Sequence, residues 1–158
     1  MQQKFRHYAN LDYLSTGLDD PWVMTHTDII AIPLPDNHFD CIICYHVLEH
    51  IADDRQALKE LFRVLKPDGW AILQSPIDVN RETTLEDPRV TTPEAHRKLF
   101  GQDDHLRVYG RDYIERLREA GFHVTPDTFI QQLSNKMIDK FGLIKEEVLF
   151  FCKKPIIS

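Results

Sequence analysis

Two apolar runs with an amphipathic stretch between them give the clearest pattern along the chain. Residues 39–45 are almost entirely apolar, which is typical of a parallel strand that is covered on both faces. Residues 53–65 place apolar side chains at the spacing of one helical face and charged side chains on the other. Residues 70–74 are again mostly apolar. The order predicts a strand, a helix and a second strand, which is the repeating unit of a parallel α/β sheet.

Residues that start and stop helices mark both ends of the predicted helix. Asp53 can accept hydrogen bonds from the first free N–H groups, and Gln56 follows three residues later, which approximates a capping box. Pro67 and Gly69 come after the last apolar position. Proline lacks the N–H that a helix interior needs, and glycine readily adopts the positive φ found beyond helix ends. We therefore expect these two residues to end the helix.

The rest of the chain predicts shorter elements on either side of one long polar stretch. Strands are predicted at residues 11–18, within 22–32, at 122–129 and at 148–152, and helices at 111–120 and 134–141. Residues 76–109 are rich in Asp, Arg, Thr and Pro and are predicted as a long loop or lid insertion. We expect a single domain over residues 1–158, with a Rossmann-like, mostly parallel α/β sheet whose ligands lie beyond the carboxyl ends of the strands.

The charge balance narrows the choice of partners. The chain carries 19 basic and 25 acidic residues, a net charge of −6, and has no Lys/Arg cluster of the kind that binds nucleic acid. Its apolar runs are far shorter than the roughly 20 residues that span a bilayer. Residues 1–7 lack the apolar core of a signal peptide. We expect no nucleic-acid partner, no membrane partner and a cytoplasmic location.

Two of the three cysteines have a spacing that could signal redox or metal chemistry. Cys41 and Cys44 form a C-x-x-C pair, but they lie inside the apolar run of residues 39–45 with no helix start beside them. Free cysteines are among the most buried residue types. We therefore expect both to be buried, inert strand residues in a reducing compartment.

Four short sequence words occur in a characteristic order. They are Thr27-Asp28-Ile29 with Ile32-Pro33-Leu34-Pro35-Asp36, then Phe39-Asp40, then His46-Val47-Leu48-Glu49-His50-Ile51, and last Arg63-Val64-Leu65-Lys66-Pro67-Asp68-Gly69. On these words, residues 11–129 resemble the small-molecule methyltransferases of the type 11 group, within the class I S-adenosylmethionine-dependent methyltransferases. Asp68 stands where that family more often has a second glycine. The resemblance implies a Rossmann-like class I fold with S-adenosylmethionine as cofactor.

The resemblance also implies residues that hold the cofactor. Asp19 matches the acidic residue that binds the ribose hydroxyls, and Asp28 matches the residue that accepts from the adenine amino group. Ile29 would pack on the adenine face. Tyr45 and His46 match positions near the methionine part of the cofactor and the methyl acceptor. The residues alone leave simpler interpretations open, in which the two aspartates shape turns and Tyr45 and His46 only end a strand.

The chemistry of methyl transfer limits which catalytic groups are needed. The sulfonium of the cofactor is a strong electrophile, so the reaction needs positioning of the acceptor more than acid–base chemistry. A general base is required where the acceptor must lose a proton, and the candidates are His105, Tyr109 and His46. Asp104 and Arg107 are candidates for binding a small polar acceptor. The residues from Asp104 to Tyr109 could equally be a hydrogen-bonded anchor of the long loop.

The glycine-rich turn that follows the first strand of such folds is not found in the sequence. Residues 1–10 are too polar for a strand at the centre of a parallel sheet. We therefore expect a truncated fold without its first strand, and weak or absent cofactor binding. A homo-oligomer, with or without exchanged strands, would cover the strand edge left open. The same feature leaves room for a non-catalytic role through oligomerisation or partner binding.

A metal-dependent hydrolase is the remaining alternative. His46, Glu49 and His50 satisfy the H-x-x-E-H pattern, in which two histidines on one helical face bind zinc and the glutamate is the general base. Glu115 or Glu119 could supply a third ligand. His46 directly follows the apolar run, however, so a helical relation between the two histidines is not assured. We expect Glu49 and His50 to brace the turn after the strand, and we expect no metal site.

Overall fold

The structure, a computed structural model, describes residues 14–15 and 25–156. Predictions for residues 1–13 and 16–24 lie outside the described residues. They include most of the first predicted strand and the proposed ribose-binding residue Asp19.

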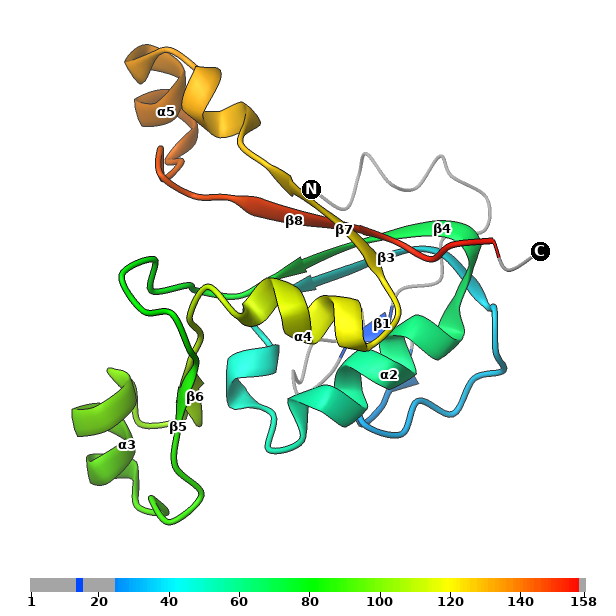
Figure 1. Cartoon of the computed structure of the whole chain (residues 1–158), viewed down its shortest axis with the longest axis horizontal. Coiled ribbons are helices and arrows are strands. Elements are labelled where there is room, and N and C mark those ends of the chain that lie inside the picture. Colours follow the sequence, from blue (N-terminus) through cyan, green and yellow to red (C-terminus); the bar gives the residue numbers. More distant parts are fainter. Residues whose placement is uncertain (1–13, 16–24, 157–158) are drawn as a thin grey trace.

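A four-stranded sheet organises the described part of the chain (Figure 1). Its strands, in spatial order, are β3 (Phe39–Tyr45), β4 (Leu65–Gln74), β8 (Leu149–Lys153) and β7 (His123–Asp127). β3 and β4 are parallel, whereas β8 is antiparallel to both of its neighbours, β4 and β7. Three strands therefore share one direction and β8 is reversed. The predicted α/β class is confirmed, although β3 and β4 are the one pair of parallel neighbours in this sheet.

Two smaller pairings lie outside this sheet. β1 (Leu14–Ser15) and β2 (Thr25–His26) pair in parallel, within the two regions predicted as early strands. β5 (Leu85–Glu86) and β6 (Arg107–Val108) pair antiparallel. The second pairing joins two parts of the long polar stretch that lie more than twenty residues apart in the sequence.

The helix α2 (Asp54–Val64) forms as its end signals predict. The Asp53 carboxylate accepts a hydrogen bond from the backbone N–H of Gln56 at 2.9 Å, which satisfies one free donor of the first turn. One face of α2 is buried through Ala57, Leu58 and Leu61, which the sequence placed at helical spacing, and also through Val64. The predicted cap and apolar face are therefore confirmed.

The end of α2 differs from the prediction. The helix ends at Val64 and the strand β4 starts at Leu65, directly after it. Pro67 and Gly69 therefore lie inside a strand and are not the residues that end the helix. Leu65 pairs with Phe39 and Trp70 pairs with Cys41, so the intervening residues of β4 bulge out of register. Sequence patterning missed the early start because only Leu65 makes the first pairing, and its partner lies 26 residues away.

Helix α4 (Tyr113–Glu119) lies beside α2 on the same side of the sheet (Figure 1). Tyr113 and Leu117 are fully buried in the common core. Gly121 follows the helix with a φ of 108°, and a Cβ at this position would lie 2.8 Å from the Phe62 ring of α2. Both the positive φ and the close approach therefore require glycine where α4 passes into β7.

The polar stretch predicted as a loop contains regular structure. Besides β5 and β6 it contains helix α3 (Pro93–Phe100), which projects away from the sheet (Figure 1). Thr92 caps α3 by accepting from the Ala95 N–H, and Gly101 ends it with a φ of 91°. The polarity of the segment hid this helix, whose single buried residue is Phe100. A lid function for the segment stays a prediction.

The chain between β7 and β8 forms a separate arm. It comprises the 3-10 helix η2 (Phe129–Gln132) and α5 (Asn135–Phe141), which lie beyond one end of the sheet (Figure 1). The predicted short helix is confirmed, and Gly142 ends it with a φ of 62°. Among the described residues, no helix is long and apolar enough to cross a lipid bilayer.

Strand β3 is more exposed than its apolar sequence predicts. Ile43 is 65% exposed and Tyr45 is 51% exposed, and within the described residues β3 has β4 as its one neighbour in the sheet. Cys44 is buried, and burial raises the pKa of its thiol to about 12, as expected of an inert cysteine. Cys41 is half-buried. The apolar pattern thus predicted the strand, but not its position at an edge of the described sheet.

Candidate functional site at the carboxyl ends of β3 and β4

The chain turns sharply where it leaves β3. His46 has a φ of 54°, a left-handed conformation that is uncommon for residues other than glycine. Its backbone N–H still donates to the carbonyl of Gln74 at 2.8 Å, so the turn is attached to the end of β4. The His46 ring stacks on Tyr45 with a centroid separation of 4.3 Å. The 3-10 helix η1 (Leu48–His50) begins immediately afterwards, so His46 and His50 do not share a helix.

A buried carboxylate lies at the centre of this turn. Glu49 is 1% exposed, and its Oε2 accepts a hydrogen bond from the Ser75 hydroxyl at 2.9 Å. Its Oε1 has no hydrogen-bond partner among the described residues, and His46 Nδ1 lies 3.7 Å from it. Buried acceptors are normally paired, because leaving one unpaired costs about 1–3 kcal/mol. The bond from Ser75 agrees with the predicted bracing role of Glu49, and the unpaired Oε1 leaves room for a further partner.

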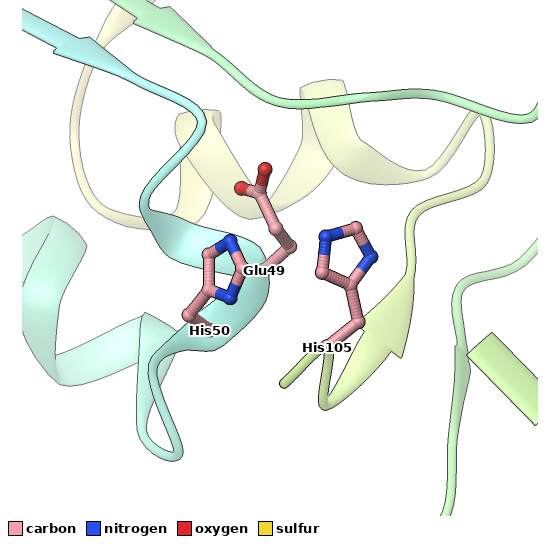
Figure 2. A group of neighbouring side chains, drawn as sticks. All are labelled: Glu49, His50 and His105. Carbon is pink, nitrogen blue, oxygen red and sulfur yellow. The ribbon is translucent and has the colours of Figure 1, made fainter. Parts of the chain in front are cut away.

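Two imidazole rings approach this carboxylate from different parts of the chain. His50 belongs to η1, and the buried His105 lies just before β6; their ring centroids are 4.7 Å apart, edge to face. Figure 2 shows that both rings and the Glu49 side chain converge on one point. One nitrogen from each ring and one oxygen of Glu49 all lie within 4.8 Å of one another. The sequence analysis identified His105 as a candidate but did not predict its contact with residues 46–50.

Neighbouring groups define the state of these rings. His50 Nδ1 lies 3.2 Å from both the carbonyl and the Oδ2 of Asp104. Burial, and next the adjacent His50 ring, lower the pKa of the His105 imidazole, whereas Glu49 and Asp104 act in the opposite direction. His105 is thus held in its neutral form, in which one ring nitrogen is free to accept a proton or bind a cation. Asp104, predicted to bind substrate, orients His50.

Arg107, predicted to bind substrate, is a buried anchor. Its guanidinium donates to the backbone carbonyl of Leu48, the first residue of η1, and to those of Ile51 and Ala52 just beyond η1. The same guanidinium donates to Glu86 at 3.1 Å, within the β5–β6 pairing. Arg107 therefore fixes the turn that carries Glu49 and His50 to the polar segment that carries His105. These contacts favour the alternative in which this run of residues anchors the segment.

Tyr109, predicted as a catalytic residue, is also a core residue. It is fully buried, and its hydroxyl donates to Asp54 at 2.7 Å. Arg116 donates to the same Asp54 oxygen at 2.9 Å. Burial, with the neighbouring Asp54 next, raises the pKa of the Tyr109 hydroxyl well above its usual range. The phenol therefore stays protonated and bound inside the core, which does not suit a general base.

A second polar group lies at the strand ends. Gln74, buried, donates through Nε2 to Glu147 Oε1 at 3.2 Å, and the Tyr45 hydroxyl donates to the same oxygen at 3.3 Å. The Gln74 Oε1 has no hydrogen-bond partner among the described residues. Burial and then Glu147 raise the pKa of Tyr45. The sequence analysis identified Tyr45 but not Gln74 or Glu147. Glu147 lies more than 70 residues after Gln74 in the sequence, so their contact could not be read from spacing.

The predicted adenine-binding residues lie at the start of the described chain. Asp28 is exposed, and its Oδ1 accepts from the Ile30 N–H at 3.1 Å, so the carboxylate shapes a local turn and keeps one oxygen open to solvent. Ile29 is buried in the core. The structure does not bring either residue into contact with Glu49, His50 or His105. Their roles toward adenine stay predictions, as does that of Asp19.

Comparison with solved structures defines the class of the fold. The S-adenosylmethionine-dependent methyltransferase from Mesorhizobium loti superposes with a TM-score of 0.55 at 17% sequence identity, over 87% of this chain and 72% of that one. Identity this low establishes a shared fold alone. The described sheet, with one reversed strand between two strands of the common direction, is therefore that of a class I methyltransferase.

Sequence comparison shows which proteins parts of the chain resemble. Residues 2–73 match the family described as Methyltransferase domain. The chain is 35% identical over 98 residues to an uncharacterized 37.1 kDa protein in transposon TN4556 of Streptomyces fradiae, which is 61% of this chain and 28% of that protein. It is 51% identical over 39 residues to the ubiquinone/menaquinone biosynthesis C-methyltransferase UbiE of Serratia proteamaculans, 25% of this chain and 16% of that one.

These matches confirm the resemblance that the four sequence words indicated. Residues 2–73 are similar to the Methyltransferase domain family, and the chain shares its fold with S-adenosylmethionine-dependent methyltransferases. It spans less than a third of the length of either curated relative. A missing first strand stays a prediction.

Proposed function

We propose that the chain binds S-adenosylmethionine at the carboxyl ends of β3 and β4 and that its methyl group passes to a small-molecule acceptor. The observation that carries the proposal is the pair of buried polar side chains at these strand ends, Glu49 and Gln74, each with an oxygen that no described residue satisfies. In α/β sheets, ligands bind beyond the carboxyl ends of parallel strands. The similarity to methyltransferases, among them one named as a probable S-adenosylmethionine-dependent methyltransferase, supports S-adenosylmethionine as the methyl donor.

Between His46 and Tyr109, two of the three predicted general bases, His46 suits the role better. Its side chain is 44% exposed at the strand end, whereas Tyr109 is buried and bound to Asp54. Glu49 lies close enough to stabilise a protonated His46, since His46 Nδ1 and Glu49 Oε1 are 3.7 Å apart. His46 would take a proton from a hydroxyl or amine acceptor as the methyl group is transferred.

Titration calorimetry with S-adenosylhomocysteine tests cofactor binding. We expect Asp28→Ala to weaken binding by about 1–3 kcal/mol, the scale of a lost hydrogen bond to a charged group. Asp40→Ala is the matched control, because Asp40 is also an exposed carboxylate but pairs with Lys66 at the other end of β3. No binding to folded wild-type protein at millimolar ligand would contradict the proposal and favour a non-catalytic role.

We also infer that a second copy of the chain pairs along β3, in the cytoplasm. The exposed Ile43 and Tyr45 support this inference, because an open edge with apolar side chains favours pairing with another strand. Light scattering of wild-type protein and of Ile43→Lys tests it. A dimeric wild type and a monomeric variant are expected, whereas a monomeric wild type would contradict it.

A further inference from the structure

We propose that Glu49, His50 and His105 form a binding site for one divalent metal ion. One nitrogen from each histidine and one oxygen of Glu49 lie within 4.8 Å of one another (Figure 2). Ligands of a tetrahedral zinc ion are about 3.3 Å apart when each bond is near 2.0–2.1 Å. Modest side-chain rotations would therefore close the three donors around an ion.

The unpaired oxygen of Glu49 is independent support for a cation at this point. Ser75 holds Oε2, while Oε1 is buried with no hydrogen bond from any described residue. A buried carboxylate oxygen is costly unless something positive or hydrogen-bonding faces it. A metal ion between Oε1 and the two rings would supply that charge.

The histidines are arranged as metal ligands usually are. Asp104 engages His50 through Nδ1, which leaves the Nε2 of that ring free for an ion. Such carboxylate contacts to the distal nitrogen orient metal-binding histidines in many proteins. No described residue hydrogen-bonds the His105 ring, so either of its nitrogens is available.

Hydrogen bonds hold the two parts of the site together without an ion. The Leu106 N–H donates to the Glu49 carbonyl at 2.9 Å, and Arg107 donates to the Leu48 carbonyl at 2.8 Å. These bonds join the residues next to His105 directly to η1. The site is thus largely organised in advance, which lowers the ordering cost of binding.

The donor set indicates the class of metal. Two imidazole nitrogens and one carboxylate oxygen favour zinc, manganese, iron or cobalt over magnesium and calcium, which prefer oxygen ligands. Three protein ligands leave at least one position open, as in catalytic zinc sites. His46, whose Nδ1 is 3.7 Å from Glu49 Oε1, lies near enough to become a fourth ligand.

This arrangement differs from the H-x-x-E-H hydrolase considered from the sequence. His46 is on a turn rather than on a helix with His50, and the third ligand is His105. Glu115 and Glu119, the third ligands nominated from sequence, instead pair with Arg118 and Arg55. The expectation of no metal site is therefore replaced by a proposal that the sequence alone could not support.

Calorimetric titration of zinc chloride into chelator-treated 158-residue protein tests the site. We expect saturation at one equivalent, and affinity at least about tenfold lower in both Glu49→Gln and His105→Ala, since even outer contacts to metal ligands are worth that much. His123→Ala is the matched control, because His123 is exposed at the start of β7, and its affinity should equal that of wild type.

A second readout separates this site from surface binding. Cobalt(II) in a site with several protein ligands should give visible absorption bands that disappear in the double variant Glu49→Gln/His105→Ala. Far-UV circular dichroism establishes that each variant is folded. No saturable zinc binding by folded wild type, or unchanged affinity and cobalt spectrum in the folded double variant, would overturn the proposal.

Discussion

The two ends of the β3–β4 pair differ in how completely their buried polar groups are hydrogen-bonded. At the amino end, Lys154 is 9% exposed and its ammonium is fully used, with acceptors on Asn37, Phe62, Arg63 and Leu65 at 2.8–3.3 Å. At the carboxyl end, Glu49 is more deeply buried and one of its oxygens lacks a partner among the described residues.

The difference distinguishes a structural site from the proposed ligand site. Lys154 satisfies carbonyls at the end of α2 that the helix itself leaves unpaired, so all its contacts serve the fold. A hollow at the amino end lies beside Phe62, Arg63 and Lys154, but its charged groups already have partners. Two of the four buried polar atoms that lack a partner among the described residues, Glu49 Oε1 and Gln74 Oε1, lie at the carboxyl end, where a ligand would complete them.

The largest expected effect on stability is at the amino end. Lys154→Ala would leave at least two carbonyls unpaired near the core, and we expect a loss of about 3 kcal/mol in the free energy of unfolding. Urea denaturation measures it. Lys153→Ala is the matched control, because the exposed ion pair of Lys153 with Asp68 should contribute less than about 1 kcal/mol. Equal losses in the two variants would contradict the comparison.

The next effect concerns the anchor of the carboxyl end. Arg107→Lys keeps the charge but cannot reproduce the fork that reaches three carbonyls and Glu86. We expect a loss of about 2 kcal/mol in the free energy of unfolding. The same variant should raise hydrogen exchange at the Leu106 amide, which bonds the Glu49 carbonyl. Unchanged stability and exchange would show that Arg107 does not fix this turn.

Glu49→Gln should separate stability from activity. The amide can still accept from Ser75, and it removes a buried charge, so the free energy of unfolding should change by no more than about 1 kcal/mol. Methyl transfer should fall at least about tenfold, equivalent to about 1.4 kcal/mol. Denaturation and a methyltransferase assay on the same samples measure both. A large stability loss with unchanged activity would make Glu49 structural, like Lys154.

The smallest effect is an acid-dependent one at the amino end. Hydrogen bonds from Arg63 lower the pKa of Glu60, whose Oε2 also accepts from the Ile32 N–H at 2.9 Å. Because the folded pKa is the lower one, this stabilisation is present above the unfolded value of about 4.3 and is lost as pH falls through the folded value. Denaturation of wild type and Glu60→Gln from pH 6 to pH 3 should converge at the acid end. Parallel profiles would remove Glu60 from the account.

Local signals explain what the sequence could predict. The cap at Asp53, the apolar face of α2 and the strand at residues 39–45 depend on neighbours in the chain, and all three are confirmed. The four sequence words also sufficed to predict the fold class and the similarity to methyltransferases. Helix α3 had signals at both ends, Thr92 and Gly101, but its polar surface offered no apolar face to recognise.

Contacts between distant segments explain what the sequence could not predict. His105 meets His50 across 55 residues only because β5 pairs with β6 and Arg107 binds η1. The burial of Arg107 and Tyr109, which turns two candidate site residues into anchors, depends on the same packing. These contacts depend on the tertiary structure, and neither the spacing nor the type of the residues predicts them.

A nuclear magnetic resonance titration tests the central claim, that ligands bind at the carboxyl rather than the amino end of β3 and β4. S-adenosylhomocysteine is added to ¹⁵N-labelled protein, and shifts of backbone amides are followed. We expect the largest shifts at residues 44–50 and 74–75, with little change at residues 62–63 and 153–154. Largest shifts around Lys154, or none at millimolar ligand, would contradict the account.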